Sequence, residues 1–246
     1  MAGDYVTQAA AIEFAQAVTQ SWLGRIGPRV TGIYLIGSLA HGGFSARYSD
    51  IDMALITETL LDAGELGVMT GPIAGHPEAL ASRLSVFWTD RYFSGGRFPP
   101  LDRVDCLDHA VSLYERERIL PARPGLGEIR SYLAAEPFRK WRQEVERLSS
   151  LDELTARDHK RYLRALLYPA RFLYSWETGR ITSNDEAAAF LQRRRPAGLD
   201  LDIIERALEC RNSGNDPDDL FGERGKLLGL RDTCEQLTAA EQAWRT

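Results

Sequence analysis

The chain has 246 residues, of which 44% are hydrophobic and 26% charged, and its net charge at pH 7 is −5. This composition is typical of a soluble globular protein and excludes a disordered or collagen-like chain. The sequence holds no run of about 18 apolar residues, which excludes a transmembrane helix, and neither half is basic enough to predict a nucleic-acid-binding platform.

The first half of the chain has the pattern of mixed strands and helices. Apolar residues recur at near-helical spacing in the first segment, whereas short β-rich runs follow it. Two neighbouring prolines, Pro99 and Pro100, favour the start of a helix. The pattern predicts a helix over 5–23, strands over 30–36 and 51–56, a short helix with loops over 60–80, a strand over 84–89, a helix after Pro100 and a strand over 111–114.

The second half of the chain has the pattern of helices alone. Apolar residues recur with helical periodicity, and Ser, Asp, Gly or Pro separate the segments. Helices are predicted over 126–148, 156–176, 184–195, 200–212 and 218–243. We therefore expect an α+β protein, with a mixed sheet and flanking helices in residues 1–125 and an all-α helical bundle in residues 126–246.

One segment carries residues suited to phosphate chemistry. A predicted strand ends in Gly37 and Ser38, and after eleven residues a new strand opens with Asp50 and Asp52. Because side chains alternate along a strand, the two carboxylates point the same way about 7 Å apart. Mg²⁺ suits such a pair, since it takes one or two carboxylates and fills its other positions with water and phosphates. Gly37 lets a phosphate approach the backbone, and the Ser38 hydroxyl can donate to a phosphate oxygen.

This segment resembles the polymerase-beta-like nucleotidyltransferases, in which an apolar strand and Gly-Ser precede Asp-x-Asp. The plan of the whole chain is most similar to that of the streptomycin/spectinomycin adenylyltransferases. Residues 172–181 (FLYSWETGRI), followed by Asp185, are similar to a helix-end segment of their drug pocket. The resemblance implies a catalytic nucleotidyltransferase domain over 1–125, a helical substrate-binding domain over 126–246 and ATP as the donor. It also implies that Asp50 and Asp52 are catalytic and hold Mg²⁺, and that Asp185 contacts a cationic acceptor.

The loop between the two halves of this segment supplies a further candidate. Arg47 lies there, and its guanidinium can bind a phosphate bidentately. We therefore place Arg47 with Gly37 and Ser38 among the nucleotide-binding residues.

Two positions depart from the family pattern. The family places a third carboxylate on the next strand, where it acts as a metal ligand or general base, and this chain has Ser85 there. A serine cannot accept the proton at neutral pH, so Asp90 and Asp105 remain as weak candidates for the base. Leu173 stands where streptomycin-modifying relatives tend to have an aromatic residue, which argues against streptomycin as the acceptor.

The resemblance implies an enzyme with a role in antibiotic resistance, and the sequence predicts a cytoplasmic location. The N-terminus lacks the basic residues of a secretory signal, and three cysteines without CxxC spacing predict neither a disulfide framework nor a zinc site. We expect a monomeric protein with no nucleic-acid or membrane partner. Its expected activity is the Mg²⁺-dependent transfer of AMP from ATP to a hydroxyl of an aminoglycoside-like or aminocyclitol-like molecule. Two alternatives stay open: a transferase acting on a protein hydroxyl, and a nucleotide-binding protein that has lost catalysis, which Ser85 motivates.

Overall fold

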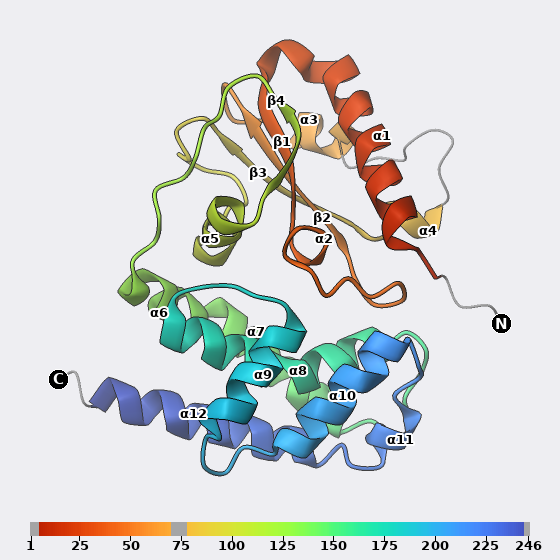
Figure 1. The fold of residues 1–246 in the computed structure, drawn as a ribbon, viewed down its shortest axis with the longest axis vertical. Helices are drawn as coiled ribbons and strands as arrows, with labels where there is room; N and C mark the ends of the chain where they lie inside the picture. The colour runs from red at the N-terminus through yellow and green to blue at the C-terminus, as the bar shows by residue number, and fades with distance from the viewer. Residues whose placement is uncertain (1–4, 70–77, 244–246) are drawn as a thin grey trace. The chain divides into compact units, whose positions relative to one another are not determined.

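The computed structural model describes residues 5–69 and 78–243. The chain forms two compact units, Met1–Pro124 and Gly125–Thr246. The division along the sequence falls next to the boundary predicted near residue 125. Figure 1 shows the first unit as a sheet with flanking helices and the second as helices alone. Within the described ranges, no helix is both long and apolar enough to cross a membrane.

The first unit is built on a four-stranded sheet of order β3-β2-β1-β4. β1 pairs antiparallel with β2 and with β4, whereas β2 and β3 run parallel. The predicted strands and flanking helices are present, and residues 70–77 of the predicted 60–80 region lie outside the described residues. The elements are α1 (Gln8–Ile26), η1 (Gly27–Arg29), β1 (Val30–Ile36), α2 (Ser38–His41), β2 (Ile51–Thr57), α3 (Ala63–Met69), α4 (Glu78–Ala81), β3 (Leu84–Asp90), α5 (Pro100–Asp108) and β4 (Val111–Glu115).

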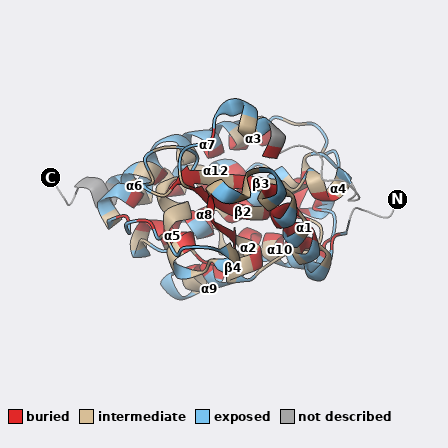
Figure 2. Ribbon diagram, turned by 90° about the horizontal axis from the view of Figure 1, so that it is seen from above, coloured by how far each residue is buried: buried red, intermediate tan, exposed pale blue. Residues whose placement is uncertain are grey.

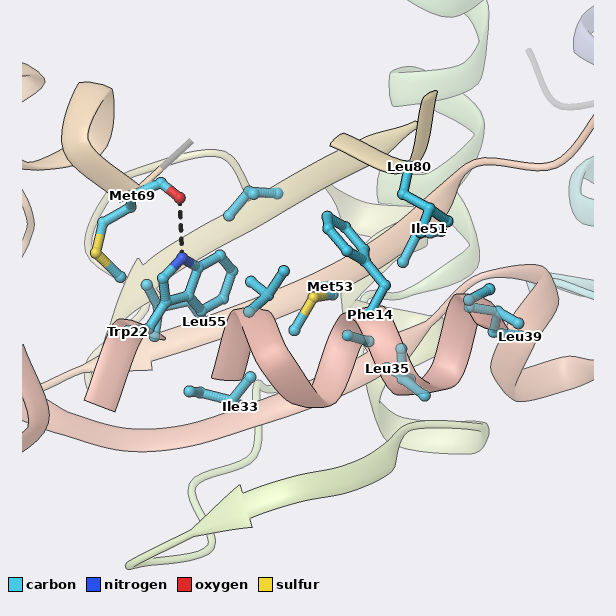
Figure 3. Close-up of a cluster of buried hydrophobic side chains, with 14 of the residues drawn as sticks. Phe14, Trp22, Ile33, Leu35, Leu39, Ile51, Met53, Leu55, Met69 and Leu80 are labelled. Atoms are coloured by element: carbon cyan, nitrogen blue, oxygen red, sulfur yellow. Dashed lines mark hydrogen bonds between the residues drawn. The ribbon is translucent and has the colours of Figure 1, made fainter. Parts of the chain in front are cut away.

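The two faces of this sheet carry different cores. On one face, Phe14 and Trp22 of α1 pack against alternate residues of β1 and β2 in a large buried cluster, shown in Figure 3. The Trp22 indole N–H, buried in this cluster, donates to the Met69 carbonyl at 2.9 Å. On the other face, Tyr34, Ile36, Ala54 and Ile56 form a smaller cluster with Cys106 of α5. Because strand side chains alternate, Asp52 lies on the same face as Ala54 and Ile56, which is the face that α5 covers.

The second unit consists of helices that carry both buried and exposed residues, and Figure 2 shows such mixed colouring along α9 and α7. The core includes an aromatic stack in which Trp141 of α7 lies 4.7 Å from Tyr168 of α8, measured between ring centroids. The Trp141 indole N–H donates to the Ala165 carbonyl at 3.0 Å, which fixes α7 on α8. The helices are α6 (Leu126–Ala134), α7 (Glu136–Ser149), α8 (His159–Thr178), α9 (Asn184–Arg194), α10 (Leu201–Ser213), α11 (Asp218–Phe221) and α12 (Lys226–Ala243).

Two of the predicted long helices are each divided in two, so these predictions were wrong. The region 126–148 breaks at Ala135, whose ψ of −116° is not helical. Pro137 follows in the first turn of α7, and in an unbroken helix its ring would clash with the Leu133 carbonyl. The region 218–243 breaks between α11 and α12, where Gly222 and Gly225 weaken the helix.

Candidate active site

The turn that ends β1 brings a backbone and a carboxylate together. Gly37 has φ 68° and ψ −155°, a backbone conformation that favours glycine. A Cβ at this position would lie 2.3 Å from Oδ2 of Asp52. The absence of a side chain at Gly37 therefore lets the Asp52 carboxylate pack directly on the backbone of this turn.

The two predicted metal ligands lie at the start of β2. Asp52 is the second residue of the strand and lies on the face that α5 covers. Asp50 immediately precedes the strand, and the alternation of strand side chains predicts the same face for it. Asp52 is paired with Ile36 of β1 on one side and with Ser85 of β3 on the other. Both carboxylate residues are half-buried, so they remain accessible to a ligand from solvent.

Serine hydroxyls connect the two halves of the segment. The Ser38 hydroxyl donates to Oγ of Ser49 at 3.2 Å, and the same Ser49 oxygen accepts from the Ser45 N–H at 2.9 Å. The Arg83 guanidinium stabilises the loop between α2 and β2 by donating a 2.8 Å hydrogen bond to the Ala46 carbonyl. Ser38 is thus fixed against the residue that precedes Asp50, a link that the sequence alone did not indicate.

Asp105 contacts the turn that follows β1. It belongs to α5, its side chain is buried, and its Oδ2 accepts a hydrogen bond from the Gly37 N–H at 2.6 Å. A hydrogen bond to an ionised carboxylate is shorter and stronger than one between neutral groups. Asp105 and Asp52 therefore hold the Gly37 turn from two sides. The Gly37 N–H is therefore already hydrogen-bonded to Asp105.

Asp90, the other base candidate, lies at the opposite end of the sheet. It is paired with Thr57 at the far end of β2, whereas Ser85 is the β3 residue beside Asp52. Its carboxylate accepts from the Ser94 hydroxyl at 2.6 Å and from the N–H groups of Ser94 and Tyr92. Burial acts to raise the pKa of Asp90, but these hydrogen bonds together lower it below its usual value. Asp90 therefore closes a turn and lies outside the candidate site.

An arginine that the sequence analysis did not single out lies beside Ser85. The Arg97 guanidinium donates to Oγ of Ser85 at 3.3 Å and to the Val86 carbonyl at 3.1 Å. It also lies over the Phe87 ring, 4.4 Å from the centroid. Where the resemblance places a negative charge, this chain holds a positive one. The preceding Gly95–Gly96 pair is the one local signal that marks this position.

Arg47 and His41 lie near the turn in sequence and make aromatic contacts. Arg47 lies in a turn of the loop, with its guanidinium 5.2 Å from the Tyr48 ring centroid. His41 ends α2, and its ring contacts His109, which follows α5, at 5.6 Å between centroids. The second contact joins α2 to the helix that carries Asp105.

The predicted acceptor residue, Asp185, belongs to the second unit. It lies in the first turn of α9, is exposed, and its Oδ1 accepts from the Asn212 amide at 2.8 Å. Burial and the nearby Arg171 lower the pKa of the Arg211 guanidinium, whereas the charge of Asp185 opposes both effects. Leu173, the residue used to argue against streptomycin, is buried in α8.

The donor set of the first unit suits a hard divalent cation. Asp50 and Asp52 offer carboxylate oxygens, and Mg²⁺ takes one or two carboxylates together with water and substrate phosphates. No cluster of three or more His, Cys, Asp or Glu ligands occurs among residues 5–69 and 78–243. The pair therefore fits a metal that is held jointly with a phosphate-bearing substrate.

Comparison with solved structures identifies the architecture. No protein-family model matches the chain, and no match was found among curated proteins. The chain is similar to spectinomycin adenyltransferase AAD(9) from Enterococcus faecialis, whose crystal structure contains ATP and spectinomycin. The TM-score is 0.66 at 11% sequence identity, over 91% of this chain and 99% of that chain. The chain shares the fold of this enzyme. The predicted fold class, and the resemblance at the level of fold, are confirmed.

Proposed function

We propose that this protein is a Mg²⁺-dependent nucleotidyltransferase that transfers AMP from ATP to a hydroxyl group of a small cationic acceptor. The observation that carries the proposal is the packing of the Asp52 carboxylate on the Gly37 backbone, with Asp50 on the same face. A turn and two carboxylates arranged in this way suit a triphosphate and its metal. The structural likeness to an adenyltransferase solved with ATP supports the same reading.

The residues of the first unit have distinct roles in this proposal. Asp50 and Asp52 would hold the metal, and Asp105 would keep the Gly37 turn in place. The Ser38 hydroxyl would donate to a phosphate oxygen in place of the Ser49 oxygen to which it is bonded in the free protein. When bound, Mg²⁺ neutralises the negative charge that develops on the phosphoryl group and on pyrophosphate. Arg47, in the loop before Asp50, is the second proposed phosphate contact.

The reaction is a displacement at the α-phosphorus. The acceptor oxygen forms a bond to this phosphorus while the bond to the oxygen shared with the β-phosphate breaks, so pyrophosphate leaves with the electron pair. The hydroxyl proton passes to water, because Ser85, beside Asp52 on β3, offers no carboxylate to receive it.

The proposed acceptor is an aminocyclitol or an aminoglycoside. The neighbouring structure was solved with spectinomycin, and the exposed Asp185 carboxylate of α9 would attract a protonated amine. Asp185→Asn should then raise the KM for the acceptor several-fold and leave that for MgATP unchanged. Glu209→Gln, which removes an exposed charge from α10, is the matched control. Equal acceptor kinetics in the two variants would remove Asp185 from the acceptor site.

The test of the proposal is a transfer assay with α-labelled MgATP and a panel of aminocyclitols and aminoglycosides that includes spectinomycin. We expect label on one compound, and we expect Asp50→Asn and Asp52→Asn to abolish it. Asp152→Asn, which removes an exposed loop carboxylate without a hydrogen-bond or ion-pair partner among the described residues, should leave it unchanged.

Two other outcomes would each favour an alternative function. Nucleotide binding by the wild type without label on any compound or protein would favour a nucleotide-binding protein that has lost catalysis, which Ser85 motivates. Label on a protein from a cell extract, lost in Asp50→Asn, would favour transfer to a protein hydroxyl. Absence of both binding and transfer would contradict the proposal.

A further inference from the structure

The backbone fixes Arg97 against β3 before any ligand is bound. Arg97 and Trp88 exchange two main-chain hydrogen bonds, of 2.9 and 3.2 Å, in an isolated antiparallel bridge. The preceding Gly96 makes this approach possible, because its φ is 93° and a Cβ there would lie 2.2 Å from the Trp88 carbonyl oxygen. The loop therefore returns to the strand at one defined residue.

The guanidinium is also held, but its charge is not neutralised. Its contacts are the Ser85 hydroxyl, the Val86 carbonyl and the Phe87 ring, all of them uncharged. Within the described part of the chain, no carboxylate lies within ion-pair distance of Arg97. By contrast, Arg116 of the same unit pairs with Glu58. A guanidinium has five N–H donors, so Arg97 retains donors for a ligand.

This charge lies beside the proposed metal ligands. Ser85 and Phe87 share the face of Asp52, since Asp52 is paired with Ser85 in the parallel register. Neighbouring strands lie about 4.8 Å apart. The Arg97 guanidinium, bonded to Ser85, thus lies beside the strand next to Asp52, and the two side chains form no ion pair, so the guanidinium charge is not cancelled by this carboxylate.

We infer that Arg97 binds a phosphate oxygen of the donor triphosphate on the β3 side of Asp52, an inference that rests on the proposed function. Guanidinium matches the geometry of a phosphate because two N–H groups can donate in parallel. The serine at position 85 fits this role: its hydroxyl accepts from Arg97 without cancelling the charge, whereas a carboxylate there would form an ion pair and compete with the phosphate. The Arg97 guanidinium thus places a positive charge beside the β3 position at which the family pattern has an acid.

The experiment measures phosphate binding by calorimetry with three probes: MgATP, magnesium tripolyphosphate and adenosine. Tripolyphosphate reports on phosphate contacts whatever base the donor carries. The variants are Arg97→Ala and Arg97→Lys, with Arg116→Ala as the control. Arg116 is likewise an arginine of the first unit, but it is bonded to Glu58 after the far end of β2. Thermal unfolding of each variant verifies that it is folded.

We expect Arg97→Ala to weaken binding of MgATP and of tripolyphosphate by roughly 10- to 100-fold, the range for a charged hydrogen bond. Arg97→Lys should weaken phosphate binding less than Arg97→Ala does, because lysine keeps the charge but lacks the two parallel N–H donors of the guanidinium. Adenosine binding should not change in either variant. Arg116→Ala should bind all probes as the wild type does.

Two results would overturn the inference, and they are distinguishable. Wild-type affinity for both phosphate probes in folded Arg97→Ala would overturn the inference and leave the proposed function intact. Absence of MgATP and tripolyphosphate binding in the wild type itself would overturn both. If Arg97→Ala does not fold, Arg97→Lys decides, since unchanged affinity for both phosphate probes in that variant would contradict bidentate phosphate binding.

Discussion

The buried carboxylate of Asp105 accepts a 2.6 Å hydrogen bond from the backbone N–H of Gly37, 68 residues earlier in the chain. This bond ties α5 to the turn between β1 and α2. Because Gly37 also contacts Asp52, the position of the proposed metal ligand depends on a residue that would touch neither metal nor substrate.

Removing this carboxylate should loosen the turn. Asp105→Ala leaves the partly buried Gly37 N–H without its partner, which should cost about 1 kcal/mol of unfolding free energy, the low end of the range for an unsatisfied donor. The rate of transfer should fall together with the stability. Asp105→Asn, which keeps an acceptor oxygen, should retain more of the transfer activity and more of the unfolding free energy than Asp105→Ala does. Urea unfolding measures the loss. The control is Asp108→Ala, which removes a more exposed carboxylate of α5 paired with Arg123; an equal loss in both variants would contradict the role of Asp105.

A side chain at Gly37 should disrupt the site more than the fold. Gly37→Ala places a Cβ 2.3 Å from Oδ2 of Asp52 and forces alanine to a φ of 68°. Such backbone strain costs on the order of 1–3 kcal/mol, and the displaced carboxylate should weaken Mg²⁺-dependent nucleotide binding by at least tenfold. Calorimetry with MgATP and urea unfolding measure the two effects.

The matched control for this variant is Gly127→Ala. Gly127 lies in α6, and a Cβ there meets no atom within 4 Å. Alanine in a helix is more stable than glycine by roughly 0.5–1 kcal/mol, so this variant should be slightly stabilised and should bind nucleotide normally. Normal nucleotide binding by Gly37→Ala would show that the close approach to Asp52 is not required.

Restoring an acid on β3 should impair the site. Ser85→Glu puts a carboxylate next to the Arg97 guanidinium, and the resulting ion pair should weaken binding of MgATP several-fold. In the Arg97→Ala background the same substitution should have a smaller effect, because the pairing partner is absent. A double-mutant cycle of MgATP affinities measures this coupling. Faster transfer by Ser85→Glu would instead show that the chain lacks a base at this position.

The turn that Asp90 closes should respond to pH. Its hydrogen bonds lower the pKa of Asp90 in the folded state despite its burial, so at low pH the unfolded chain takes up this proton more readily. The contribution of Asp90 to stability is present above the unfolded-state pKa of about 4 and is lost as pH falls through the folded-state value. Asp90→Asn should lower the free energy of unfolding at pH 7 and reduce its dependence on pH at pH values below about 5.

The same pH series in Asp152→Asn gives the reference, because that residue is an exposed loop carboxylate. Urea unfolding at several pH values measures the slope for both variants and the wild type. Identical slopes in Asp90→Asn and in the wild type would rule out this contribution.

The sequence by itself determined the features that depend on neighbours along the chain. Short apolar, β-rich runs predict β1 and β2, and the alternation of strand side chains predicts that Asp50 and Asp52 share a face. The change from mixed elements to helices near residue 125 is likewise visible in local periodicity. The breaks at Ala135 and at residues 222–225 were missed because helical periodicity continues across them.

The tertiary structure alone decided what surrounds these carboxylates. Asp105 reaches Gly37 only because α5 packs on the face of β1 and β2, and no local pattern encodes a hydrogen bond across 68 residues. Arg97 reaches Ser85 because the loop after β3 turns back at Gly96 and pairs with Trp88. Both contacts join residues that are separated along the chain and are brought together by packing. The strand register and the direction of each side chain follow from the assembled sheet and not from the local sequence.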